Sequence, residues 1–137
     1  MIPFIIYDSE GRIKQTGVCQ KELLEEQVSL VPTYFGLQIT EGNADLFTDY
    51  VSSESVLKKP TQATLLDKAT LTANGIDVIN ITGAPYGIFT ATNVVTGESV
   101  SGLINGSDTF ETTVVGTYAI KIEAFPYLDF TTTIEAI

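Results

Sequence analysis

The sequence predicts a mainly β protein, in which a small β-rich region with hairpins and one short helix precedes an antiparallel β-sandwich. Hydrophobic residues make up 44% of the 137 residues and charged residues only 18%. This balance favours a packed core over disorder. Turn signals recur at short intervals after residue 60, where threonine becomes abundant and basic residues become rare. Short segments bounded by such turns are typical of sandwiches and barrels.

Residues 1–60 are predicted to form the small β-rich region. Phe4–Tyr7 and Arg12–Val18 have the pattern of a hairpin, with Gly11 supplying the positive φ that its turn requires. Lys21–Gln27 places leucines on one face and glutamates on the other, so we expect a short helix that docks through its leucines. A further strand is predicted over Tyr34–Thr40, and a second hairpin over Asp49–Ser52 and Ser55–Leu57.

Residues 61–137 are predicted to form an immunoglobulin-like sandwich, and Lys58-Lys59-Pro60 marks the boundary because proline cannot donate to a strand ladder. Near the C-terminus, Tyr118, Ile120 and Ile122 alternate with Thr117, Ala119, Lys121 and Glu123, and the pattern repeats over Phe130, Thr132 and Ile134, which indicates one buried and one solvated face. Seven short strands are predicted, over residues 69–73, 76–82, 86–93, 98–103, 109–114, 117–125 and 130–136.

The charge of the chain argues against two classes of partner. The net charge is −10, and seven basic residues are too few to neutralise a row of phosphates, so neither nucleic acid nor an anionic membrane is expected as a partner. The apolar start of the chain is short, ends at Asp8 and lacks a basic region before it, so we predict neither a signal peptide nor a membrane span. Cys19 is the single cysteine, which excludes an internal disulfide.

The sequence predicts no catalytic residues, no metal site and no cofactor, and therefore not an enzyme. The chain contains no histidine, which removes Ser-His-Asp and Cys-His arrangements and the usual zinc sites. Glu25 and Glu26 are adjacent on the predicted helix and point in different directions. Asn105–Asp108 and Glu41–Asp45 are rich in oxygen ligands, but they lack the order of a calcium loop and are interpreted as turns.

Six apolar side chains are candidate interface residues. They belong to the first strand, to the leucine face of the helix and to the aromatic stretch around Pro126. Each of them could instead be a core residue, and for the aromatic stretch we favour the core. The six are Phe4, Ile6, Leu23, Leu24, Phe125 and Tyr127.

Two segments resemble a known family. Asn74–Gly83 (NGIDVINITG) and Gly116–Asp129 (GTYAIKIEAFPYLD) resemble the C-terminal half of small tailed-phage proteins, in which an immunoglobulin-like domain closes with a GTY…FPYLD strand pair. The N-terminal half is similar to the same proteins in the order of its short motifs. These are Ile6–Asp8 with Gly11, Gly17–Cys19, Glu41–Asp45, Tyr50-Val51 and Lys59-Pro60.

The resemblance implies a structural component of the virion without catalytic residues. Our leading expectation is a tail-associated adaptor or fibre-associated protein, assembled in the bacterial host cytoplasm as a homo-oligomer together with other virion proteins. In this scheme residues 1–60 attach the protein to the particle and residues 61–137 project outward, with weak contact to the host surface. Two alternatives stay open: a capsid decoration protein and a carbohydrate-binding or adhesion module.

Overall fold

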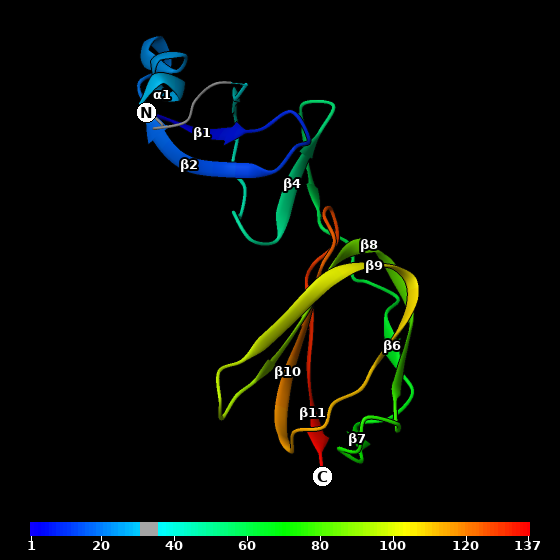
Figure 1. The fold of residues 1–137 in the computed structure, drawn as a ribbon. Helices are drawn as coiled ribbons and strands as arrows, with labels where there is room; N and C mark the ends of the chain where they lie inside the picture. The colour runs from blue at the N-terminus through cyan, green and yellow to red at the C-terminus, as the bar shows by residue number, and fades with distance from the viewer. Residues whose placement is uncertain (31–35) are drawn as a thin grey trace. The chain divides into compact units, whose positions relative to one another are not determined.

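A computed structural model describes residues 1–30 and 36–137 (Figure 1). The chain is mainly β, as predicted. It divides into two compact units, Met1–Lys59 and Pro60–Ile137, and this division lies one residue before the predicted boundary. Each hydrophobic cluster consists of residues from one unit only, so the two units have separate cores.

The N-terminal unit is built on a three-stranded antiparallel sheet. Its strands are β1 (Ile2–Tyr7), β2 (Ile13–Cys19) and β3 (Gln38–Glu41), in the order β2-β1-β3. The predicted first hairpin is therefore confirmed, and Gly11 has the expected positive φ of 94°. Strand β1 lies in the centre and is covered on both faces, which explains its continuous apolar run.

A second hairpin, β4 (Asp49–Ser52) and β5 (Ser55–Lys58), completes this unit and confirms the prediction. Ser53 and Glu54 both have positive φ, 49° and 64°, as a two-residue turn that follows the twist of its strands requires. The hairpin is attached to the first one where Val51 N–H donates to the carbonyl of Gly11 at 2.9 Å.

The prediction of one continuous helix over Lys21–Gln27 was wrong. The chain instead forms a 3₁₀ turn, Lys21–Leu23, and a separate four-residue helix, α1 (Glu26–Ser29). Neither piece has a side-chain hydrogen bond at its N-cap, and so short a helix has little stability of its own. Leu24 packs against the cluster of Phe4, Ile6 and Cys19, which places one leucine as predicted. Of the predicted strand Tyr34–Thr40, Tyr34 and Phe35 lie outside the described residues.

Asp49 is a buried carboxylate that ties the ends of the second hairpin together. It accepts a hydrogen bond from the backbone N–H of Asp45 at 2.8 Å and pairs with Lys58 Nζ at 2.7 Å. These contacts, the backbone hydrogen bond first, hold the pKa of Asp49 below its ordinary value of 3.8. A carboxylate whose pKa is lowered by folding stabilises the folded state above its unfolded pKa.

The contribution of Asp49 is therefore expected to disappear in acid. It is fully present above pH 3.8 and is lost as the pH falls from 3.8 through the lower pKa of the folded protein. We expect Asp49→Asn to lower the melting temperature of the N-terminal unit at pH 7, and this difference from the wild type to shrink below pH 3.8. Thermal unfolding at several pH values measures both quantities. A difference that stays constant from neutral pH into acid would contradict the assigned role.

The C-terminal unit is one curled sheet that folds over into a sandwich. Strand β8 pairs with β6, β9 and β10, and beyond β10 the sheet continues with β11 and then β7. All pairs are antiparallel except β11 with β7. The strands are β6 (Leu65–Leu66), β7 (Thr70–Leu71), β8 (Ile79–Asn93), β9 (Ser99–Phe110), β10 (Gly116–Glu123) and β11 (Phe130–Ala136).

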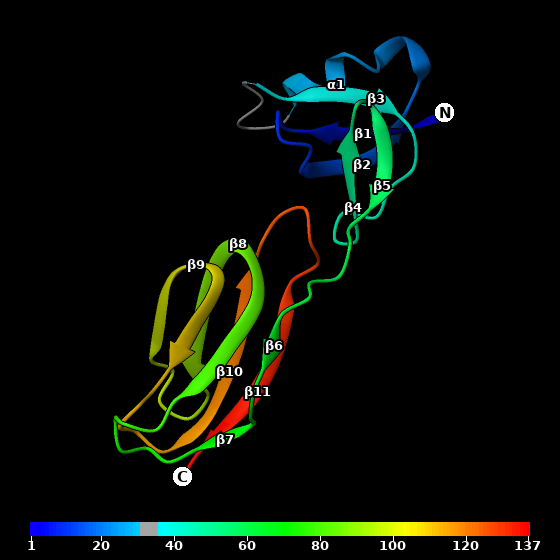
Figure 2. The same ribbon diagram turned by 90° about the vertical axis from the view of Figure 1, so that its right-hand side faces the viewer.

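Two long strands bend together and so belong to both layers (Figure 2). The first part of β8 pairs with β6 and with the end of β9, whereas its last part pairs with β10 and with the start of β9. The register shifts on both sides of Ala84, where the strands turn from one layer into the other. Gly83 and Gly106, with φ of 72° and 90°, provide the backbone freedom for this bend.

The bend corrects the predicted number of strands. The segments predicted over 76–82 and 86–93 belong to one strand, β8, which starts at Ile79. Strand β9 contains most of 98–103 but only the first two residues of 109–114, because it ends at Phe110. Glycine signals at Gly83 and Asn105-Gly106 suggested turns that end a strand, but here the chain bends without leaving the ladder. The predicted alternation in β10 is confirmed, because Tyr118, Ile120 and Ile122 are all buried.

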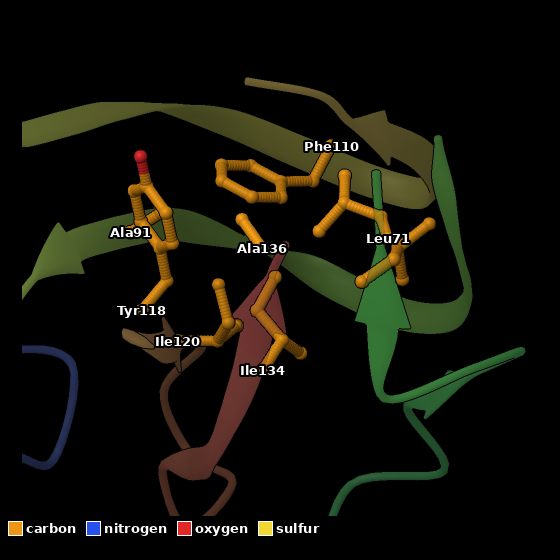
Figure 3. Packing of buried hydrophobic residues seen from close by; sticks show 8 residues of the cluster. Leu71, Ala91, Phe110, Tyr118, Ile120, Ile134 and Ala136 are labelled. Atoms are coloured by element: carbon orange, nitrogen blue, oxygen red, sulfur yellow. The ribbon is translucent and has the colours of Figure 1, made fainter. Parts of the chain in front are cut away.

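The main core lies between the two layers (Figure 3). Ile79 and Phe110 come from the layer of the first part of β8, and Tyr118, Ile120 and Ile134 come from the opposite layer. The ring of Phe110 meets the ring of Tyr118 edge-on, with centroids 5.2 Å apart. Packing of this kind between layers defines a sandwich and confirms the predicted fold class.

Tyr118 forms the corner typical of immunoglobulin-like sandwiches. Its hydroxyl donates to the carbonyl of Val114 at 2.9 Å and lies 2.8 Å from Thr112 Oγ1. A tyrosine near the start of its strand that bonds back to the preceding loop is the arrangement known as a tyrosine corner. This bond fixes the connection between β9 and β10.

Removing this hydroxyl is expected to cost stability without changing the fold. We expect Tyr118→Phe to lower the free energy of unfolding of the C-terminal unit by about 1 kcal/mol, the usual net value of a hydrogen bond. Tyr86→Phe is the matched control, because Tyr86 is 63% exposed. Denaturant unfolding measures both variants. Equal effects of the two substitutions would contradict the role of the corner.

Candidate functional site

The structure places the six predicted interface residues in different surroundings. Phe4 and Ile6 are 3% and 0% exposed and pack in the core of the N-terminal unit. They are therefore core residues, and predicting them as an interface was wrong, because β1 is a central strand covered on both faces. Leu24 is half-buried in the same core, whereas Leu23 stays 39% exposed and keeps its place as a candidate.

The aromatic stretch around Pro126 is held against its own unit. Phe125 and Tyr127 are both half-buried, and Tyr127 packs against the cluster of Ile81, Ile104 and Ile122. The backbone N–H of Tyr127 donates to the carbonyl of Ala124 at 2.8 Å.

Five exposed valines gather at one end of the C-terminal unit, and we call them the valine rim. Leu128 N–H donates to the carbonyl of Pro60, so the chain enters this unit at the end where β10 finishes and β11 starts. The valine rim lies at the opposite end, in the β8–β9 hairpin and in the connection from β9 to β10. Its members, with their exposed fractions, are Val94 (55%), Val95 (82%), Val100 (60%), Val114 (44%) and Val115 (64%).

Asn93 holds the two loops of the valine rim together. Its side chain is buried, with 2% exposure. Its Oδ1 accepts hydrogen bonds from Val95 N–H at 3.0 Å and Thr96 N–H at 3.2 Å, while its Nδ2 donates to the carbonyl of Val115 at 3.4 Å. Four of the exposed valines therefore lie in loops that Asn93 links, and the fifth, Val100, lies in β9. Grouped apolar side chains on a rigid surface are a usual mark of an interaction site.

A cavity of about 350 Å³ opens beside the valine rim. It lies between the start of β9 in one layer and the end of β9 in the other, with Val100 and Val114 at its mouth. Phe110 and Tyr118 form its apolar base, because both also belong to the main core. The cavity is large enough for one side chain of a partner.

Two carboxylates, Glu98 and Glu111, line this cavity. Both are exposed, and neither has a cationic partner among residues 1–30 and 36–137. The two basic residues of the C-terminal unit are bound elsewhere, Lys68 to Asp77 and Lys121 to Glu123 and Asp129. The site is thus apolar at its base and negatively charged at its edge.

The valine rim was not predicted from the sequence. Valine favours strands, so Val114 was assigned to the strand predicted over 109–114, whereas Val94-Val95 fell between the strands predicted over 86–93 and 98–103. One signal was available: one Val-Val pair directly precedes the turn glycine Gly116 and the other lies two residues before the turn glycine Gly97, where solvent-exposed loops are expected. Only the fold shows that these two pairs meet.

Two negative findings apply to the part of the chain that the structure describes. No group of three or more His, Cys, Asp or Glu side chains there could hold a metal ion. Within the same ranges, no helix is long and apolar enough to span a membrane.

Comparisons with known proteins add no relative. No family model matches the chain, no curated protein is similar to it at a significant level, and no solved structure matches its fold significantly.

Proposed function

We propose that this protein is a structural component of a tailed-bacteriophage virion, a tail-associated adaptor or fibre-associated protein that contacts other virion proteins. The resemblance of Asn74–Gly83 and Gly116–Asp129 to such proteins supports the virion assignment. The observation that carries the role in assembly is the valine rim beside its cavity, because exposed apolar clusters of this kind usually mediate protein contacts.

In this proposal the valine rim is the contact surface of the C-terminal unit. It lies at the end of the C-terminal unit that is opposite to Pro60, where the chain enters this unit. The protein acts in several copies per particle, since closed symmetry is usual for such parts. It is assembled into the particle in the bacterial host cytoplasm.

The first test asks where the protein is. Mass spectrometry of purified, separated heads and tails is expected to find the chain in the tail fraction, and electron cryo-microscopy to locate it there. Its presence on heads would replace the tail assignment with capsid decoration. Its absence from both fractions would end the virion proposal.

The second test asks whether the valine rim is needed. Val115→Glu is expected to leave the protein folded, because Val115 is 64% exposed, and to reduce its incorporation into particles about tenfold or more. Leu65→Glu is the matched control, since Leu65 is 68% exposed and lies away from the rim. Equal incorporation of the two variants would exclude the valine rim as the contact surface.

A further inference from the structure

The start of β9 is an edge strand without the usual protection. Within the described ranges β9 pairs only with β8, so its other edge has no strand beside it. Natural edge strands usually avoid pairing with foreign strands by means of charged side chains or proline. Residues 99–107 (SVSGLINGS) contain neither. The backbone groups of this edge are therefore available to another strand.

The register of the sheet shows where the side chains of an added strand would lie. Ile120, Ala91 and Val100 form one row across β10, β8 and β9, on the face that looks into the sandwich. A strand added to the free edge continues this row beyond Val100. Its next inward side chain then enters the cavity, above the rings of Phe110 and Tyr118.

The charge around the cavity restricts what this strand can be. A bound strand would shield Glu98 and Glu111 from water, which is unfavourable unless the partner places a positive charge beside the two carboxylates. A second C-terminal unit is a poor partner, because its only basic residues, Lys68 and Lys121, are already paired with carboxylates and the whole chain carries a net charge of −10. A different protein with lysine or arginine in an extended segment fits both requirements.

We propose that the free edge of β9 binds an extended segment of a partner protein, which adds a strand to the sheet, places an apolar side chain in the cavity and sets a lysine or arginine against Glu98 and Glu111. Main-chain hydrogen bonds give the affinity in this mode of recognition, and the pocket gives the specificity. The proposed function enters this inference at one point only: it identifies the partner that supplies the segment as a neighbouring virion protein.

Synthetic peptides test the proposal on the full chain. The probe is a peptide of about eight residues, an ordinary strand length, that alternates threonine with isoleucine and has a lysine near each end. NMR titration is expected to shift and protect backbone amides of Ser99–Leu103. A matched peptide with glutamate in place of lysine is expected to bind about tenfold more weakly. Binding of neither peptide at the β9 edge would overturn the proposal.

Two variants distinguish the pocket from the charges. Val100→Glu places a carboxylate at the mouth of the cavity and is expected to abolish binding of the lysine peptide, whereas Leu65→Glu leaves binding unchanged. The double substitution of Glu98→Gln and Glu111→Gln is expected to remove the preference for lysine over glutamate while binding persists. An unchanged preference would show that the two carboxylates do not select the partner.

Self-association is the competing outcome. Sedimentation of the chain without peptide is expected to show no dimer that depends on Val100. A dimer that Val100→Glu dissolves, together with no peptide binding, would overturn the proposal in favour of a second copy. Failure to find the protein in virions would leave these peptide results unaffected, so the two proposals can fail separately.

Discussion

Replacing Ile120 with aspartate is expected to unfold the C-terminal unit while the N-terminal unit stays folded. Ile120 is 2% exposed and packs in the main core between the two layers. The substitution removes this packing and buries a carboxylate without a partner, which together cost about 5 kcal/mol or more. Domains of this size have a total stability of about 5–15 kcal/mol. The loss is therefore comparable with the whole stability of a 78-residue unit (Pro60–Ile137).

NMR of the full chain measures this effect unit by unit. Signals from Pro60–Ile137 are expected to lose their dispersion, whereas those of Met1–Lys59 keep theirs, because each unit has its own core. Thr133→Asp is the control: Thr133 is exposed on β11, pairs with Ala119, and its replacement costs about 1 kcal/mol or less. Cooperative unfolding of the Ile120 variant at the wild-type temperature would contradict its place in the core. Collapse of both units would show that they fold as one.

Gly11→Ala is expected to separate the two hairpins of the N-terminal unit. A Cβ at this position would lie 2.0 Å from the carbonyl oxygen of Val51, which is backbone and cannot move aside without breaking the contact between the hairpins. The positive φ of 94° adds strain for any residue with a side chain. We expect a loss of about 3 kcal/mol or more, since the clash adds to about 1–2 kcal/mol of backbone strain.

Gly97→Ala separates the clash from the strain. Gly97 also has a positive φ, 77°, but no atom lies within 4 Å of the position that a Cβ would take. Its replacement is therefore expected to cost only the backbone strain, about 1–2 kcal/mol. Chemical denaturation of each variant, followed by NMR signals from the affected unit, gives both values. Similar losses at the two glycines would contradict the close contact between Gly11 and Val51.

Local sequence patterns predicted the strands and hairpins correctly where no tertiary contact opposed the local preference. The two N-terminal hairpins follow from short strands around turn residues, and both are present. The inward face of β10 follows from alternation, and it is buried as predicted. The predictions were wrong where tertiary packing overrides a local signal. Gly83 suggested the end of a strand, but it lies at a bend inside β8, because β9 bends at the same place and stays paired with β8.

The sequence by itself determined the β-rich class of this protein and the inward alternation of its last two strands, because composition and a period of two residues are properties of the chain alone. Only the tertiary structure decided which apolar residues face solvent. Phe4 and Ile6 are buried because β1 became a central strand. Five valines stay exposed because nothing in the unit packs over the end where they lie, and Asn93 links the two loops that carry four of them. Burial depends on what packs against a side chain, and the neighbours of a residue are set by the fold.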